Sequence, residues 1–167
     1  MQVAYAGTHP VVKAAVEQAN RMLRDPAFLD EIASHPKFDM SDAPPAVIAG
    51  LMRTSALKFT VETFSPRGFY RIKYRKTFAY TDSRHPNKLF LHAQKLDREI
   101  ADVAATIIHE GIHALDDAEN RYSFGHGDNS PSGKENTAPY WIGSRAYQIL
   151  SGRAGVAAPS IEEVSEH

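Results

Sequence analysis

Two histidines and a glutamate near the middle of the chain have residue types and a spacing that suit metal chemistry. The residues from His109 to His113 read His-Glu-Gly-Ile-His. On a helix, two histidines four positions apart lie one above the other, so both imidazoles can bind one zinc ion. Glu110 lies beside them, where its carboxylate can accept a proton from a zinc-bound water.

The residues around this motif predict a helix from Leu96 to Asp117. This stretch contains no proline, and its only glycine is Gly111. Apolar side chains recur in it at helical spacing: Ile100, Val103, Ala104, Ile107, Ile108 and Leu115. At about 100° per residue, His109 and His113 point away from this apolar stripe. A chance histidine pair has no reason to face away from the core, so we interpret the motif as a metal site.

A catalytic zinc ion usually has three protein ligands and one position open for water. The chain has no cysteine, which excludes thiolate ligands. We rank His126 first as the third ligand, because imidazole suits zinc and glycines on both sides indicate a constrained loop. Asp128 in the same loop is the second candidate, and Glu135 before the last predicted helix is the third. An exposed loop histidine is the alternative for His126.

Other polar residues have possible supporting roles. Asp116 or Asp117, one turn past His113, can accept the second N–H of a ligand histidine. Tyr140 and Tyr122 are candidates for a hydrogen bond to the oxyanion that forms during hydrolysis. For both tyrosines, a buried structural role is the alternative.

The rest of the chain predicts an α+β domain. Helices are expected at residues 10–24, 26–34, from 41–45 to 52, and 139–150. Strands are expected at residues 57–64, once or twice within 69–80, and at 88–92, whereas residues 1–9 are expected to form an arm.

The segment from Phe69 to Tyr80 combines aromatic with basic residues. A positive face would be formed by Arg71, Lys73, Arg75 and Lys76. Such a stretch can bind single-stranded nucleic acid by stacking and charge. Because the net charge of the chain is close to zero, we favour the solvated face of a half-buried strand.

Length and composition place limits on the function. The 167 residues suffice for one domain with a core, expected at residues 1–151, and residues 152–167 are expected to be a flexible tail. The net charge of −1 favours neither nucleic acid nor a membrane as partner. No apolar run can span a bilayer, and the N-terminus lacks the pattern of a signal peptide. No oligomerisation signal is present, so we expect a monomer.

The motif and its surroundings resemble the zincin metallopeptidases. In that family the motif lies on an active-site helix, preceded by a mixed sheet whose edge strand aligns the substrate. The resemblance implies a zincin-like fold with Zn²⁺ bound by His109 and His113, and with Glu110 as general base. It also implies that residues 88–92 form the edge strand. The resemblance covers residues 88–142, and only the motif itself is specific.

Comparison with zincin subgroups leaves the third ligand open. The metzincin continuation is absent, because Asp116 and Glu119 stand where it requires a glycine and a third histidine. Glu135 lies near the distance of the second-helix glutamate in thermolysin-like enzymes, but outside the predicted helix. The Gly-Asp pair ending at Asp128 and residues 136–140 are loosely similar to the deuterolysin-like aspzincins. Small zincin domains also resemble toxin or effector domains of secreted bacterial proteins, which implies a cognate inhibitor or immunity protein.

We therefore expect a zinc-dependent endopeptidase acting on a protein or peptide, with His109, His113 and His126 as ligands and Tyr140 near the reacting carbonyl. One alternative is a zinc amidase that hydrolyses a non-protein amide such as peptidoglycan. The other is a non-catalytic zincin-fold binding module. If both His126 and Asp128 bound the metal, the site would be closed and no water could react.

Overall fold

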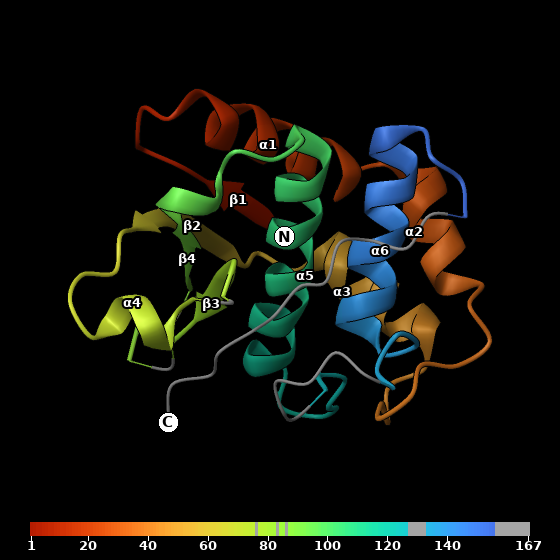
Figure 1. Ribbon diagram of the computed structural model, residues 1–167. Coiled ribbons are helices and arrows are strands. Elements are labelled where there is room, and N and C mark those ends of the chain that lie inside the picture. The colour runs from red at the N-terminus through yellow and green to blue at the C-terminus, as the bar shows by residue number, and fades with distance from the viewer. Residues whose placement is uncertain (76, 83, 86, 127–132, 156–167) are drawn as a thin grey trace.

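Four strands form a mixed sheet against which the motif helix packs (Figure 1). The computed structural model describes residues 1–75, 77–82, 84–85, 87–126 and 133–155. The strands are β1 (Gln2–Ala4), β2 (Lys58–Phe64), β3 (Ala79–Thr81) and β4 (Lys88–His92). The helices are α1 (Pro10–Met22), α2 (Pro26–Ala33), α3 (Pro45–Thr54), α4 (Tyr70–Lys73), α5 (Ile100–Ala118) and α6 (Ala138–Ser151), with a 3₁₀ turn η1 (Ala93–Lys95) before α5. The α+β class predicted from the sequence is confirmed.

The strand order is β1-β2-β4-β3, with β3 antiparallel and the other pairs parallel. The prediction that residues 88–92 form the edge strand is therefore wrong. β4 pairs with β2 on one side and with β3 on the other, so its backbone groups are used within the sheet. β3 forms the edge of the sheet on this side. A short connection joins β3 to β4, so the two strands pair as antiparallel neighbours.

The N-terminal residues, expected to form an arm, contain β1. Its pairing with β2 places Val3 opposite Phe59. The side chain of Asn20 on α1 fixes β1 from the other side. Its Oδ1 accepts from the Val3 N–H and its Nδ2 donates to the Val3 carbonyl oxygen, both at 2.9 Å. A side-chain amide thus satisfies the backbone of this short edge strand.

The first three helices follow the sequence closely, because each has proline in its first turn. Asp25 caps α2 by accepting a hydrogen bond from the Ala27 N–H at 3.0 Å. The segment from Phe69 to Tyr80 departs from the prediction of strands along its length, because residues 70–73 form α4. Tyr70 and Tyr74 are four positions apart and stack with ring centroids 6.4 Å apart, which helical backbone allows and a strand does not.

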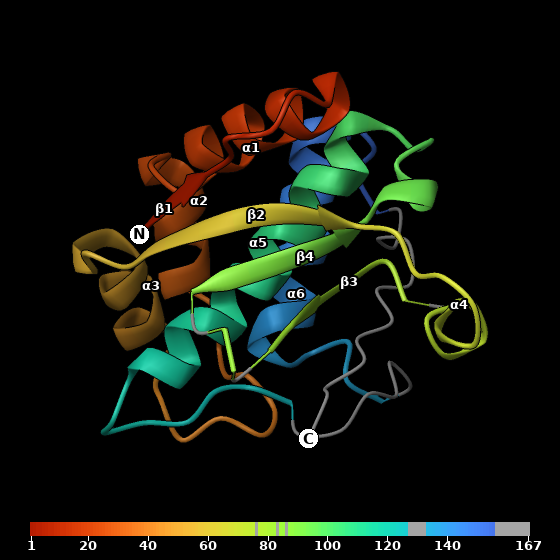
Figure 2. The ribbon, with the colours of Figure 1, turned by 90° about the vertical axis from the view of Figure 1, so that its left-hand side faces the viewer.

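The motif helix α5 lies in the middle of the fold. In Figure 2 the sheet faces the viewer, with α5 and α6 behind it and α1 above. α5 packs against α1, α6 and the sheet, and every residue from Ala101 to Ile112 is buried. The predicted apolar stripe is present, but the opposite face is also covered, so His109 is completely buried. Among the described residues, no helix combines the length and apolar character needed to cross a bilayer.

Candidate metal centre

Three histidines converge beside the C-terminal half of α5. His109 and His113 come from α5, and His126 comes from the segment that follows it. One ring nitrogen of each lies within 4.8 Å of the other two, and the Nε2 atoms of His113 and His126 are 2.9 Å apart. His109 and His126 are buried, and His113 is half-buried. The structure thus places His126, the preferred candidate for the third ligand, beside the two histidines of the motif.

The type and spacing of these nitrogens fit a zinc ion. Zn–N bonds of about 2.0–2.1 Å in a tetrahedral site place the ligand nitrogens about 3.3 Å apart. The 2.9 Å separation between His113 and His126 is slightly shorter, so a small opening of this pair would accommodate the ion. Neutral imidazole is a ligand that zinc prefers.

Two carboxylates hold the chain between α5 and His126. Asp116 Oδ1 accepts a hydrogen bond from the Phe124 N–H at 2.7 Å. Asp42 Oδ1 accepts from the Ser123 N–H, also at 2.7 Å. Phe124 is completely buried and anchors the segment in the core. The position of His126 is therefore set by the residues just before it.

Gly125 is confined by the same arrangement. A Cβ atom at this position would lie 2.7 Å from Asp116 Oδ2 and 3.7 Å from His113 Nδ1. A side chain at position 125 would therefore collide with the Asp116 carboxylate and contact the ring of His113. No hydrogen bond joins Asp116 to His113 among the described contacts, so the predicted role of Asp116 as partner of a ligand histidine stays a prediction.

Tyr140 lies against the histidines from the first turn of α6. Its ring centroid is 4.7 Å from that of His109 and 4.8 Å from that of His126. The close approach of α6 depends on Gly143, where a Cβ atom would lie 3.1 Å from the Cβ of His109. Tyr122, the other candidate, packs at the edge of the hydrophobic core.

Glu110 is completely buried on α5, next to the first histidine of the motif. Of the other carboxylates considered, Glu135 is exposed and its Oε1 accepts a hydrogen bond from the Gly133 N–H. Glu119 ends α5 and accepts from the backbone N–H groups of the next two residues. Asp128 lies outside the described residues. Asp117 is exposed and lines a neighbouring pocket.

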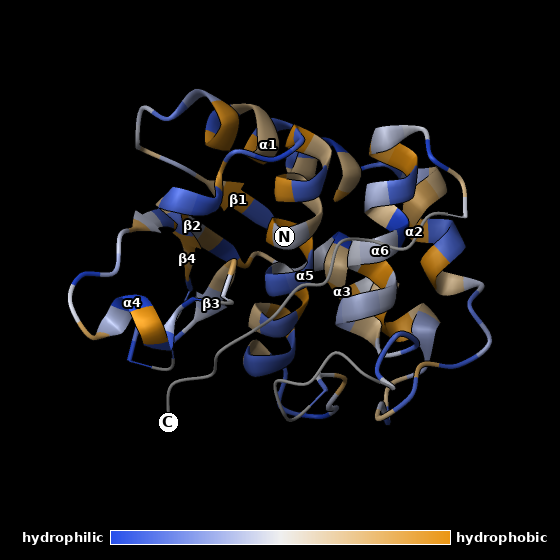
Figure 3. Cartoon of the chain, viewed as in Figure 1, coloured by the Kyte–Doolittle hydropathy of each residue, from blue (hydrophilic) through white to orange (hydrophobic). Residues whose placement is uncertain are grey.

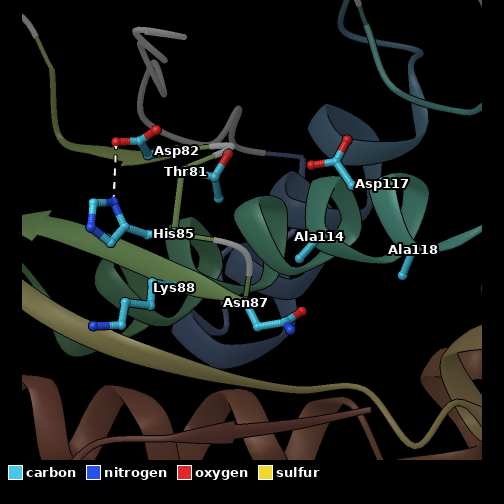
Figure 4. Close-up of a pocket in the computed structure, with 8 residues that line it drawn as sticks. All are labelled: Thr81, Asp82, His85, Asn87, Lys88, Ala114, Asp117 and Ala118. Carbon is cyan, nitrogen blue, oxygen red and sulfur yellow. Dashed lines mark hydrogen bonds and ion pairs between the residues drawn. The ribbon is translucent and has the colours of Figure 1, made fainter.

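This pocket, of about 490 Å³, lies between the last turns of α5 and the connection from β3 to β4 (Figure 4). Ala114, one helical turn beyond Glu110, lines its wall on α5. On the opposite side, Asp82 accepts hydrogen bonds from the guanidinium and backbone N–H of Arg84. These bonds hold the pKa of Asp82 well below its usual range, so the carboxylate remains ionised. A polar pocket therefore adjoins the side of α5 that carries Glu110.

Two residues that shape the candidate centre, Asp42 and Gly143, are absent from the predicted site residues. Asp42 is distant along the chain, and nothing near it points to the segment before His126. Gly143 did carry a signal, because a glycine inside a predicted helix often marks a close contact.

No protein-family model, no curated protein and no solved structure matches this chain.

Proposed function

We propose that the protein is a zinc-dependent endopeptidase. The observation that carries this proposal is the convergence of His126 on the His-Glu-x-x-His pair. His126 follows His113 by 13 residues and belongs to a separate segment. A histidine pair without a function on the helix surface would not require a third buried imidazole beside it. Three histidines leave one position of a tetrahedral ion for water, as catalytic zinc sites require.

When bound by His109, His113 and His126, zinc would supply a Lewis acid that polarises the scissile carbonyl and lowers the pKa of water to about 7. Glu110 accepts the proton of the attacking water and returns it to the leaving amine. Its burial strengthens its electrostatic interaction with the reacting groups, because little water screens them. Tyr140, with its ring against two of the histidines, is the candidate donor to the oxyanion.

An extended peptide is the substrate that the fold favours. β3 pairs only with β4 among the described strands. The backbone groups on its other edge can therefore form hydrogen bonds with the backbone of an extended substrate. β3 also packs against α5, and the pocket beside Ala114 adjoins both elements. We therefore propose that a peptide adds to this edge of β3 and directs a side chain toward the pocket that Thr81 and Ala114 line.

The alternatives make different demands on the same residues. A zinc amidase acting on peptidoglycan would use the same histidines and Glu110 but would not need the edge of β3. A non-catalytic binding module would need a fourth protein ligand, for which Asp128 is the candidate. The likeness to effector domains extends the proposal to a secreted enzyme that is blocked by a cognate inhibitor protein.

Matched variants test the proposed chemistry. Glu110→Gln should retain zinc and lose about 10²–10⁴-fold in turnover of a peptide library, because the general base is removed. His113→Ala should lose both zinc and turnover, and Glu17→Gln, on the exposed side of α1, should change neither. Full activity in Glu110→Gln would contradict the mechanism. Cleavage of peptidoglycan fragments without cleavage of any peptide would favour the amidase.

A further inference from the structure

The segment around α4 exposes large apolar side chains at the end of the sheet. Phe69, Tyr70 and Ile72 are 79%, 59% and 70% exposed. They lie within four consecutive positions, whereas apolar residues on a protein surface are ordinarily scattered singly. In Figure 1, α4 projects from the sheet on the side away from α6, and in Figure 3 it carries strongly hydrophobic colour beside hydrophilic colour. A contiguous exposed apolar cluster of this kind marks an interaction surface.

A stack of aromatic rings fixes the base of this projection. Tyr74 is buried and stacks on Tyr80 with ring centroids 5.4 Å apart, and Tyr80 stacks on Phe90 at 5.0 Å. Tyr70 continues the stack outward at 6.4 Å from Tyr74. Because β3 and β4 hold the inner rings, the apolar tip at Phe69 and Ile72 is presented outward in a defined position.

The same segment is strongly basic. Between Thr63 and Thr81 the sequence has five basic residues and no acidic residue, although the whole chain has a net charge of −1. Arg67, Arg71 and Arg75 are exposed around the apolar tip. An open hollow of about 330 Å³ beside α4 is lined by Arg67 and Arg71, together with Ser65, Pro66, Gly68 and Gln94. Two guanidinium groups at one hollow suit a phosphate group.

We propose that α4 and the turn before it dock the protein on an anionic phospholipid surface. Phe69 and Ile72 enter the boundary between headgroups and acyl chains, and the two arginines of the hollow hold lipid phosphates. Apolar and aromatic tips flanked by Lys and Arg are the composition that binds such interfaces. This inference replaces the expectation from net charge that the protein has no membrane contact, because the positive charge is concentrated on one segment.

A nucleic acid is a less suitable partner for this surface. Single strands bind to rows of aromatic faces along a basic groove. Here the outermost side chains include the aliphatic Ile72, and the face of Tyr70 toward the sheet is already stacked on Tyr74. The position and chemistry of the tip therefore favour lipid.

Co-sedimentation of the whole protein with vesicles tests the proposal. The protein should sediment with phosphatidylcholine vesicles that contain about 30% phosphatidylserine and remain in solution with pure phosphatidylcholine, because the arginines require anionic lipid. Phe69→Ala with Ile72→Ala should weaken binding at least about tenfold, and Arg67→Gln with Arg71→Gln should do the same. Met40→Ala is the control, because Met40 is 62% exposed and lies outside this segment.

Three results would overturn the proposal. The first is no binding to the anionic vesicles, or binding that the Phe69/Ile72 pair does not change. The second is binding of an oligodeoxythymidine that competes with the vesicles and is lost in the same variants, which would identify a nucleic-acid surface. The third is binding of soluble glycerol phosphate without any binding to vesicles, which would reduce the site to a phosphate pocket and contradict membrane docking. None of these measurements depends on zinc or on peptide cleavage.

Discussion

Replacement of Gly125 by alanine tests how the loop positions His126. The new Cβ would lie 2.7 Å from Asp116 Oδ2, where ordinary contacts begin at 3.4 Å. The carboxylate must move, and its 2.7 Å hydrogen bond from the Phe124 N–H will be strained or lost. A hydrogen bond to a charged group contributes about 1.5–3 kcal/mol, so we expect the free energy of unfolding to fall by about 2 kcal/mol.

The same substitution should weaken zinc binding, because the hydrogen bond to Asp116 fixes Phe124, two positions before His126. Changes in such supporting residues typically reduce metal affinity 10–100-fold. Chelator competition measures the zinc affinity, and urea denaturation of the metal-free protein measures the stability.

Gly50→Ala is the matched control, because Gly50 lies inside α3 with open space around the added methyl group. This variant should gain up to about 1 kcal/mol in stability and bind zinc like the wild type. Wild-type zinc affinity in Gly125→Ala would refute the role given to the Asp116–Phe124 hydrogen bond in positioning His126.

Three further substitutions have expected outcomes. Gly111→Ala should lose about 1–3 kcal/mol in urea denaturation, because its Cβ would lie 2.8 Å from the buried ring of Phe59, and unchanged stability would contradict this packing. Burial lowers the pKa of His92, so the unfolded chain binds the proton more readily and stability should fall as the pH drops below about 6.5. His92→Phe should flatten this dependence in denaturation at pH 7.5 and pH 5.5, and an unchanged slope would assign it to another group. Asp102→Ala should lose about 1.5–3 kcal/mol, because the half-buried Arg98 loses its 2.9 Å ion pair while its other hydrogen bonds remain. A loss below about 1 kcal/mol in urea denaturation would mean that water replaces the ion pair.

The features that could be predicted from the sequence are those set by local spacing. Proline positions and apolar periodicity located α1 and α2 to within two residues at each end. The helical spacing of His109 and His113 predicted the position of the candidate metal centre on α5. His126 was ranked first on ligand chemistry and on its flanking glycines, and it lies with the motif pair.

The features that were missed depend on contacts between distant segments. Whether β4 is an edge or an interior strand depends on β3 folding back beside it, and no local pattern encodes that order. β1 is too short to show a period and depends on the side chain of Asn20. The alternating aromatic and basic residues around α4 fit a strand equally well. The stacking of Tyr74 on Tyr80, a contact between separate segments, favours the helical turn. The enclosure of α5 likewise follows from α6 packing over the face that periodicity alone left open.

Elemental analysis of the purified protein tests the central claim most directly. The wild type, His126→Ala, Asp128→Ala and the exposed control His9→Ala would be purified without added metal and then supplied with zinc. The proposed centre predicts one zinc per chain in the wild type, Asp128→Ala and His9→Ala, and loss of zinc in His126→Ala. A wild type without zinc even after supply, or a His126→Ala variant that keeps it, would contradict the three-histidine centre.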